Sequence, residues 1–422
     1  MFKRLLSLLS VLLSIPLFAQ NDCSNGRYYD PIFPEILVTS GLPFGMAPTT
    51  YDSLNIPVPD SVNTYPLLMD VYQPLTDTGT LNRPVIVLAF GGAFVYGARV
   101  SPDIVQLCYK YAQMGYVAVS IDYRLSDELL TNPSAYNATK AVLKGTHDMK
   151  AAVRFLRRQA TELNNLLRID TNQIYVGGVS AGAFCAIHTA YLDKESELPE
   201  ILKSTAAKYG GLEGQSGNPG YSSKVMGVIN LCGAIGDTAW IAPGDLPIVS
   251  MHGTADGTVP YDYDTIRILN INYPVHGSAS IHRHLDHLNT EFPDQPIAHA
   301  FYTWIGADHV PFLTDSAYFD TTFWFTRDFM FERVCSGISG ISEQRPIVNY
   351  HLFPNPTTGL LKIAALSPEF SATVVDATGK KVKEAKSRGI ELDIDLSPFS
   401  KGIYLINIQG SGIRDTRRIV LE

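Results

Sequence analysis

One stretch, Gln173–Leu192, constrains the fold of this chain more than any other. It reads QIYVGGVSAGAFCAIHTAYL, with a G-x-S-x-G sequence running from Gly178 to Gly182. The run Gln173–Val176 carries the β-branched and aromatic residues of a buried strand, and the Ala/Cys/Ile-rich residues after Ser180 have helical spacing. We therefore predict a strand that turns abruptly into a helix at Ser180.

Such a turn has two consequences for its serine. The backbone of Ser180 is expected in a strained conformation, and Gly178 and Gly182 are expected to prevent clashes around it. The hydroxyl is expected at the carboxyl end of the sheet, beside helix N-terminal amides that can receive an anion. Because the motif is short, an ordinary Gly/Ser turn is the alternative interpretation, and the rest of the chain has to decide between the two.

Strands alternate with helices on both sides of this stretch. Several strand runs are almost continuously apolar, so we expect a mostly parallel sheet covered by helices on both faces, an α/β fold. The expected strands are Pro66–Tyr72, Pro84–Phe90, Val117–Asp122, Gln173–Val176, Val225–Leu231, Pro247–Met251 and His299–Ile305, and the expected helices are Pro102–Met114 and Thr139–Leu166.

The N-terminus has the pattern of a signal peptide over residues 1–20. Two basic residues precede the apolar run Leu5–Leu17, which is too short to span a membrane, and cleavage is expected near Ala19 or Gln20. A hydrophobic content of 45%, a charged content of 18% and a net charge of −8 indicate a globular protein. They offer no basic field for nucleic acid, and we expect no stable membrane insertion.

The five cysteines fall into two groups. Cys108, Cys185 and Cys232 lie inside apolar segments and are expected to be core residues. Cys23 and Cys335 bracket the main domain, so a bridge between them is one open alternative. No C-x-x-C or His/Cys spacing suggests zinc, and we predict no metal.

A serine hydroxyl is a poor nucleophile near neutral pH, so Ser180 needs a histidine as base and a carboxylate to orient that histidine. In a sheet of this kind, the acid and then the histidine come from loops after later strands. Asp256 lies on a Gly-rich turn after Pro247–Met251, and His309 follows the last expected strand. The sequence therefore predicts Ser180, Asp256 and His309 as a catalytic triad.

Other residues could compete for these roles. Asp262, Asp264 and Asp308 are alternative acids, but each lies off the strand-end turn or beside the histidine. His252 ends the strand before the acid and is interpreted as structural. His188 lies on the helix after Ser180 and is expected to be a buried packing residue.

His282, His284 and His287 form an H-x-H-x-x-H run with Asp286 inside it. Metal binding is an alternative there, because His284 and His287 share a helical face. A solvated helix face is the favoured interpretation.

An attacked carbonyl develops negative charge that needs two or three backbone N–H donors. Ala181, directly after the serine, is expected to supply one. The loop Gly91–Ala93, after the strand Pro84–Phe90, is expected to supply the others, although a plain glycine turn would also fit.

Residues from about 66 to 335 resemble the carboxylesterase/lipase branch of the α/β-hydrolase superfamily. The matching pieces occur in order as LMDVYQP, VIVLAFGGAFVYG, VAVSIDYRL, AAVRFLR, GGVSAGAF, MHGTADGTVPY and GADH. The resemblance implies ester hydrolysis through an acyl-serine intermediate, with no cofactor and with Gly92, Ala93 and Ala181 as the oxyanion hole. One departure is that the family's His-Gly-Gly-Gly loop reads Phe90-Gly91-Gly92-Ala93 here, which leaves its support undetermined.

The C-terminal part contains only short alternating segments with glycine turns, which predicts a small all-β domain. Its expected strands are Leu361–Ala364, Ala372–Val375, Ile390–Ile394, Gly402–Ile408 and Thr416–Leu421. It resembles the sorting domain of type IX secretion cargo from Bacteroidota through its FPNPTTG, VDATGK and KGIY sequences. This implies recognition by the type IX secretion machinery, with a carbohydrate-binding or adhesive domain as the alternative. The expected divisions are a signal peptide at residues 1–20, a catalytic domain at 21–335, a linker at 336–349 and the sorting domain at 350–422.

Together these features predict a secreted or surface-located serine carboxylic-ester hydrolase acting on small-molecule or polymer-borne esters. A feruloyl or acetyl xylan-type esterase, a lipase or a polyester hydrolase would use the same triad, so these alternatives stay open. Outside the enzymes, the alternative is an inactive hydrolase fold used for surface binding.

Overall fold

A computed structural model describes residues 23–48, 64–80, 82–266, 271–335, 350–353, 355, 357–365, 369–389, 391–410 and 413–421. The expected signal peptide at residues 1–20 and the expected linker at 336–349 lie outside these residues.

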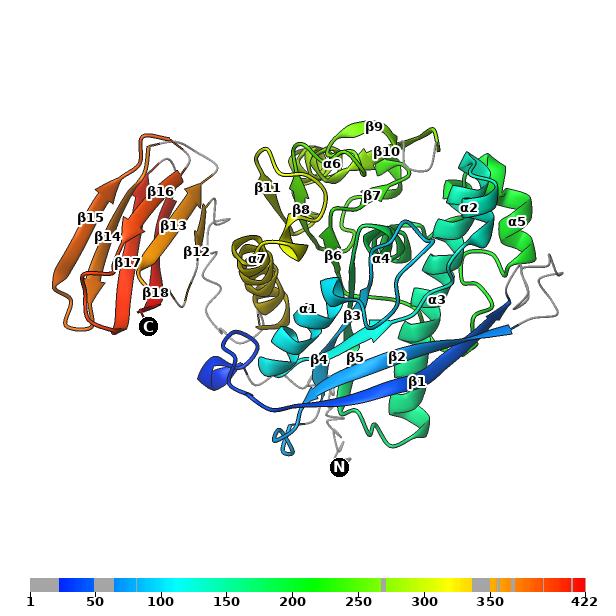
Figure 1. Cartoon of the computed structure of the whole chain (residues 1–422), viewed down its shortest axis with the longest axis horizontal. Helices are drawn as coiled ribbons and strands as arrows, with labels where there is room; N and C mark the ends of the chain where they lie inside the picture. Colours follow the sequence, from blue (N-terminus) through cyan, green and yellow to red (C-terminus); the bar gives the residue numbers. More distant parts are fainter. Residues whose placement is uncertain are drawn as a thin grey trace, which may run out of the picture.

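An eight-stranded sheet forms the centre of the larger part of the molecule (Figure 1). Its strands are β1 (Ile36–Pro48), β2 (Thr64–Pro74), β3 (Arg83–Ala89), β4 (Val117–Ile121), β5 (Ile169–Val179), β6 (Val228–Leu231), β8 (Ile248–Gly253) and β11 (His299–Trp304). The order is β1-β2-β4-β3-β5-β6-β8-β11, antiparallel as far as β4 and parallel from there on. The expected mostly parallel sheet is therefore confirmed, with an antiparallel edge.

Helices cover the sheet. They are α1 (Pro102–Gln113), α2 (Asp127–Thr131), α3 (Ala135–Glu162), α4 (Ala181–Tyr191), α5 (Lys203–Lys208), α6 (Ser278–Glu291) and α7 (Ser316–Cys335). α3 packs against α4, and α1 against α7, on opposite sides of the strands in Figure 1. β3 and β4 are buried along their whole length because both of their faces lie under helices.

Local signals explain where two of these helices begin. α1 starts with Pro102, whose missing N–H is not needed in the first turn. α3 starts after Ser134, whose hydroxyl accepts a hydrogen bond from the Asn137 amide at 3.2 Å.

Short elements complete the larger part. A three-stranded sheet with the order β7-β10-β9 lies beyond the main sheet. Its strands are β7 (Ala234–Ile235), β9 (Tyr263–Ile266) and β10 (Tyr273–Gly277). Single 3-10 turns occur at Ser24–Gly26, Glu195–Glu197, Glu200–Leu202, Thr238–Trp240 and Pro311–Leu313.

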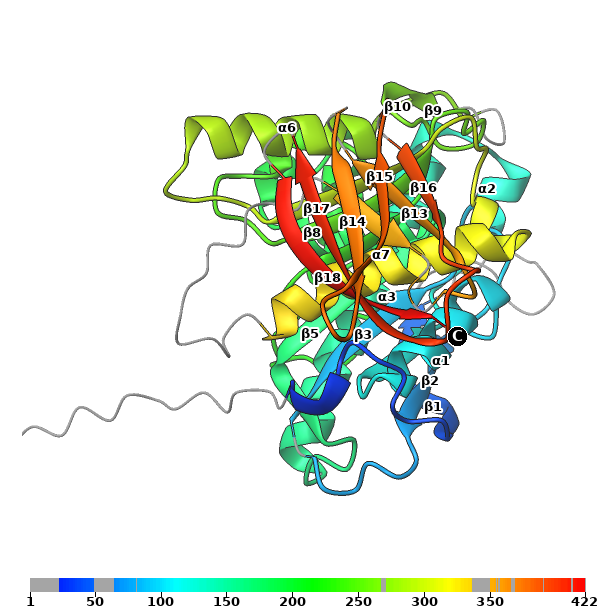
Figure 2. The same cartoon turned by 90° about the vertical axis from the view of Figure 1, so that its left-hand side faces the viewer.

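The C-terminal part is all β among its described residues and forms two antiparallel sheets, one of which faces the viewer in Figure 2. The first sheet contains β12 (Tyr350–Phe353), β13 (Leu360–Ala365) and β16 (Glu391–Asp395). The second contains β14 (Ser371–Asp376), β15 (Lys381–Lys386), β17 (Gly402–Gly410) and β18 (Ile413–Leu421). The sequence did not anticipate β12 and β15.

A disulfide joins Cys23 to Cys335, with 6.0 Å between their Cα atoms. The bridge that the sequence left open is therefore present, and it ties the start of the described chain to the end of α7. Cys108, Cys185 and Cys232 are free and buried, as expected.

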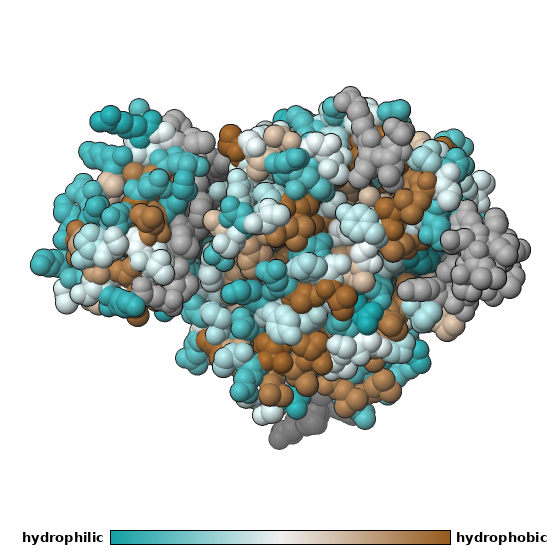
Figure 3. Space-filling model, viewed as in Figure 1, coloured by the Kyte–Doolittle hydropathy of each residue, from teal (hydrophilic) through white to brown (hydrophobic). Residues whose placement is uncertain are grey.

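The surface in Figure 3 shows apolar residues in several separate patches among polar ones. In the part of the chain that the structure describes, no helix combines the length and the apolar character that crossing a bilayer requires.

Candidate active site

Ser180 lies at the predicted turn between β5 and α4. Its backbone has φ 52° and ψ −116°, a conformation that side-chain-bearing residues rarely adopt. A Cβ atom added at Gly178 would lie 2.3 Å from the carbonyl carbon of Gly182, and one added at Gly182 would lie 2.1 Å from the Ala89 oxygen. Both glycines are thus required by close backbone approach, as the sequence predicted.

Three side chains from three strand ends meet at this turn. Ser180 follows β5, Asp256 follows β8 and His309 follows β11, all at the carboxyl edge of the sheet. Nε2 of His309 is 2.9 Å from the Ser180 Oγ, and Nδ1 of His309 is 2.6 Å from Oδ2 of Asp256. Because a carboxylate only accepts, Nδ1 carries the proton and Nε2 is free to accept the serine proton.

Asp256 is held in its ionised form although its side chain is fully buried. Burial by itself opposes ionisation, but hydrogen bonds from His252 and His309 outweigh it and hold the pKa of Asp256 well below its ordinary value. Amides of Thr258 and Val259 also donate to its Oδ1, each at 2.8 Å. The carboxylate is therefore a fixed negative charge beside His309.

His252 has a contact that the sequence did not reveal. Its Nε2 is 3.1 Å from Oδ2 of Asp256, and its Nδ1 is 2.9 Å from the Ser278 hydroxyl. This geometry is consistent with the structural role expected for His252. The residue that His252 contacts is Asp256, the acid of the predicted triad. His252 lies in β8 and Asp256 in the turn that follows it, so the contact depends on how that turn folds back and not on a periodic spacing in the sequence.

The rival acids have other partners. Asp308 accepts hydrogen bonds from the amides of Gly257 and His309, and Asp262 pairs with Arg283 on the surface. Asp264 lies in β9 and is exposed, and its Oδ1 accepts from the Thr265 amide at 2.7 Å. Among these carboxylates, only Asp256 forms a hydrogen bond with the His309 ring.

The loop after β3 lies beside the serine. Ala93 and Phe94 have φ values of 51° and 63°, so Ala93 adopts the left-handed conformation that a glycine would take more easily. Among the described residues, the amides of Gly92 and Ala93 have no hydrogen-bond partner. Together with Ala181 at the first position of α4, they are the backbone donors predicted for an oxyanion.

Apolar packing and carboxylates support this loop where a histidine was expected. Phe90 is buried and stacks on Tyr123 with ring centroids 4.3 Å apart, and the Tyr123 hydroxyl donates to the Phe90 carbonyl. Oδ2 of Asp103 accepts from the Gly91 amide at 2.7 Å. Arg99 donates from its amide and its guanidinium to Asp122. Replacing the histidine by Phe90 thus leaves a well-supported loop.

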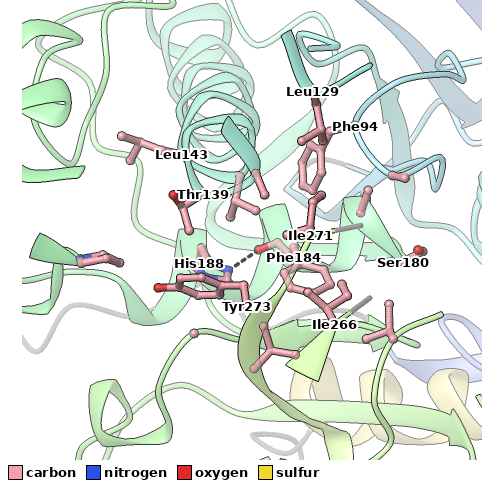
Figure 4. A pocket seen from close by; sticks show the side chains of 18 of the residues that line it. Phe94, Leu129, Thr139, Leu143, Ser180, Phe184, His188, Ile266, Ile271 and Tyr273 are labelled. Carbon is pink, nitrogen blue, oxygen red and sulfur yellow. Dashed lines mark hydrogen bonds between the residues drawn. The ribbon is translucent and has the colours of Figure 1, made fainter. Parts of the chain in front are cut away.

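A cavity opens at Ser180 and is almost entirely apolar (Figure 4). Ser180 lies at one end of it, and Phe184 and His188 line it farther along α4. His188 is buried, as predicted, but it also lines this cavity, which the sequence could not show.

The histidine run on α6 is not one solvated face, so that interpretation was wrong for part of it. His282 is buried, and its Nδ1 is 3.0 Å from Nδ1 of His299 on β11. His284 is half-buried and contacts the Ile241 carbonyl, whereas His287 is exposed. The long-range partner His299 explains why the local pattern was misleading.

The described residues contain one group of potential metal-ligand atoms, those of Cys232, Asp256 and His309, within 4.8 Å of one another. Burial raises the pKa of the Cys232 thiol, so it stays protonated and is a poor metal ligand. The other two atoms already pair with each other. This arrangement fits a triad better than a metal site.

Comparisons with known families match two separate parts of the chain. Residues 69–235 match the family model BD-FAE, and residues 351–422 match the model of a secretion system C-terminal sorting domain.

Among curated proteins, the chain is similar to Lipase 1 and Lipase 2 of Geotrichum candidum. It is 24% identical to Lipase 1 over 187 residues, which are 37% of this chain and 32% of the lipase. It is 27% identical to Lipase 2 over 130 residues, which are 30% of this chain and 22% of the lipase. The matches thus span about a third or less of the length of these relatives.

Among solved structures, the chain is similar to an esterase of Thermogutta terrifontis. The propionate-bound form is 20% identical with a TM-score of 0.45, covering 68% of this chain and 94% of that chain. The apo form is likewise 20% identical with a TM-score of 0.45, covering 71% of this chain and 95% of that chain.

Proposed function

We propose that this chain, which carries a BD-FAE-type α/β-hydrolase esterase domain followed by a secretion sorting domain, is an exported serine carboxylic-ester hydrolase. The observation that carries the proposal is the hydrogen-bonded series from Ser180 through His309 to Asp256. Its order and its protonation match what a nucleophilic serine requires.

In the first half of the reaction, Ser180 Oγ attacks the ester carbonyl while Nε2 of His309 takes its proton. Asp256 stabilises the resulting imidazolium and keeps the ring oriented. The amides of Gly92, Ala93 and Ala181 hold the negative oxygen of the tetrahedral intermediate. His309 then protonates the leaving alcohol, the carbon–oxygen bond to that alcohol breaks, and an acyl-serine forms.

In the second half, His309 removes a proton from water, which attacks the acyl-serine carbonyl. The bond to Ser180 breaks, Oγ recovers its proton from Nε2, and the carboxylic acid leaves. His309 is suited to both halves because it is partly exposed, with 18% of its side-chain surface accessible, while Asp256 is fully buried. No cofactor takes part in this mechanism.

Export is the second part of the proposal. The sorting domain over residues 351–422 indicates secretion or attachment at the cell surface. We assign a signal peptide to residues 1–20, the catalytic domain to 21–335, the linker to 336–349 and recognition by the type IX machinery to 350–422. Deletion of residues 350–422 in a host with that machinery should leave the enzyme inside the cell envelope.

The test of the activity compares the mature protein with Ser180→Ala on p-nitrophenyl esters from acetate to palmitate. We expect the variant to lose activity by a factor on the order of a thousand or more. The chain-length profile then separates esterase from lipase. Equal activity in both proteins would contradict the triad assignment. Inactivity toward every ester, together with no labelling of Ser180 by a serine-directed phosphonate, would favour the inactive binding protein instead.

A further inference from the structure

The cavity beside Ser180 is a slot along one face of α4. Ser180, Phe184 and His188 recur every four residues, so their side chains lie along the same side of the helix. All three line the cavity. The facing helix α3 supplies Ala138, Thr139, Val142 and Leu143, and the cover is formed by Ile266, Ile271, Tyr273 and Val275.

Polar groups are few along this slot. Figure 4 shows Ser180 at one end, Phe184 next along the slot, and His188 with Tyr273 farther from Ser180. The lining continues past His188 to the apolar residues Leu192, Pro199 and Leu202. No Asp, Glu, Lys or Arg side chain is among the described residues that line the slot, so an apolar body fits between Ser180 and His188, and His188 offers a polar group in the wall.

The hydrogen bonding of His188 fixes which of its nitrogens can bind a ligand. Nδ1 is 2.8 Å from the carbonyl oxygen of Phe184, and because a carbonyl only accepts, Nδ1 carries a proton. Among the described residues, no group forms a hydrogen bond with Nε2. Burial lowers the pKa of His188 to about 4, so the ring is neutral near pH 7 and Nε2 presents a lone pair.

Aromatic neighbours hold the ring in this position. Phe184 stacks nearly parallel to His188 with centroids 6.1 Å apart, and Trp240 meets it edge-on at 5.5 Å. His188 is only 6% exposed. An oriented, buried acceptor in the wall of an apolar slot is a built recognition point, because a ligand that lacks a donor leaves it unpaired.

We propose that His188 determines specificity for the acyl group, and that the preferred substrate carries a hydroxyl at the far end of an apolar acyl chain. This inference rests on the proposed function and goes beyond it by naming the acyl chemistry. In the acyl-enzyme, the hydroxyl donates to Nε2 of His188 while the body lies between Phe94 and Phe184.

The helix gives the length of this acyl group. Eight residues of helix separate Ser180 from His188, a rise of about 12 Å. The bond to Oγ and the final hydrogen bond take up about 4 Å of this distance. The hydroxyl should therefore lie about 8 Å from the ester carbonyl carbon, which fits both 6-hydroxyhexanoate and 3-(4-hydroxyphenyl)propanoate.

The experiment measures kcat/KM for methyl esters in two matched pairs. The linear pair is 6-hydroxyhexanoate and hexanoate, and the aromatic pair is 3-(4-hydroxyphenyl)propanoate and 3-phenylpropanoate. One hydrogen bond to a buried neutral acceptor predicts that the native enzyme prefers the hydroxylated ester by about five- to tenfold in at least one pair. The pair that shows the preference identifies a linear or an aromatic body.

Two variants test the residue. His188→Phe keeps a ring between Phe184 and Trp240 but has no acceptor, so the preference should fall to about one. His188→Leu repeats the test if the larger ring disturbs folding, and thermal melting of both shows that they are folded.

Two outcomes would overturn the inference while leaving the proposed function intact. One is equal kcat/KM within both pairs for the native enzyme. The other is a preference that persists in both variants. Ser180→Ala is included on the same esters, because its loss of activity tests the proposed function separately from the choice of acyl group.

Discussion

The α/β part of the chain and its all-β C-terminal part have cores that differ in size. The larger core extends through an eight-stranded sheet and its helices and holds Ser180 in a strained backbone conformation. The smaller core consists of buried residues between two antiparallel sheets, such as Ile363, Val374 and Ile406. A strained backbone conformation needs many surrounding contacts to hold it, whereas a small pair of sheets needs only enough burial to keep its strands together.

The largest effect on the reaction rate is expected from removing the negative charge of Asp256. Asp256→Asn should lower kcat by about a thousandfold or more, because the amide cannot stabilise the His309 imidazolium and favours the wrong tautomer. Ester hydrolysis measures the loss. Asp262→Asn, which removes a surface pair with Arg283, is the control and should change the rate by less than about twofold. Similar losses in both variants would contradict the assignment of the acid.

Replacing one glycine in each domain by alanine compares how much an added methyl group destabilises the two domains. Gly182→Ala places a methyl group 2.1 Å from the Ala89 oxygen, so we expect about 3 kcal/mol of destabilisation or more. Gly379→Ala, in the C-terminal domain, has φ +84° but no atom within 4 Å of the new methyl, so about 1 kcal/mol is expected. Chemical denaturation of the two variants measures the difference. Equal costs would contradict the expectation that the close contact at Gly182 costs more than the backbone strain at Gly379.

Reducing the disulfide should destabilise the larger domain and leave the stability of the C-terminal domain unchanged. Cys23 and Cys335 are joined across 312 residues, and residues 350–422 contain no cysteine. Replacing both by serine should destabilise the catalytic domain by about 3 kcal/mol. Thermal unfolding with and without a reducing agent checks this. A shift in the unfolding of an isolated C-terminal domain under the same conditions would point to a cause other than the disulfide.

Mild acid should destabilise the α/β part of the chain through its buried histidines. Burial lowers the pKa of His188 to about 4 and that of His147 to about 3. Between about pH 6.5 and these values, the unfolded chain binds protons that the folded chain does not, so stability falls as the pH falls. The loss should be about 1–2 kcal/mol per histidine by pH 5.

Unfolding free energies at pH 7 and pH 5 measure this loss. His188→Leu should reduce the difference between the two pH values, because the leucine binds no proton in either state. An unchanged difference would show that His188 does not contribute to the acid sensitivity.

The triad was predictable because each of its members depends on local sequence and on topology. Parallel strands bring their carboxyl ends to one edge, so a residue that directly follows β8 or β11 has to lie near the one that follows β5. The structure brings Ser180, Asp256 and His309 together as that rule requires. Their catalytic roles remain the prediction that the variants test.

Other features depended on partners far away in the chain. The sequence placed His282 on a solvated face, but His299, which lies on β11, covers it. β15 was missed because its residues KVKEAK are mostly charged, which is not typical of a strand. It forms a strand because it pairs with β14.

The sequence by itself determined the strand–turn–helix at Ser180, the order of the triad residues and the all-β character of the C-terminal part, because these follow from patterns within short segments. Only the tertiary structure decided that Cys23 pairs with Cys335, that His252 contacts Asp256 and that His188 lines the slot beside Ser180. Those features arise where separate segments pack together. Composition and spacing describe each segment alone, whereas burial and hydrogen bonding depend on both of the segments that come into contact.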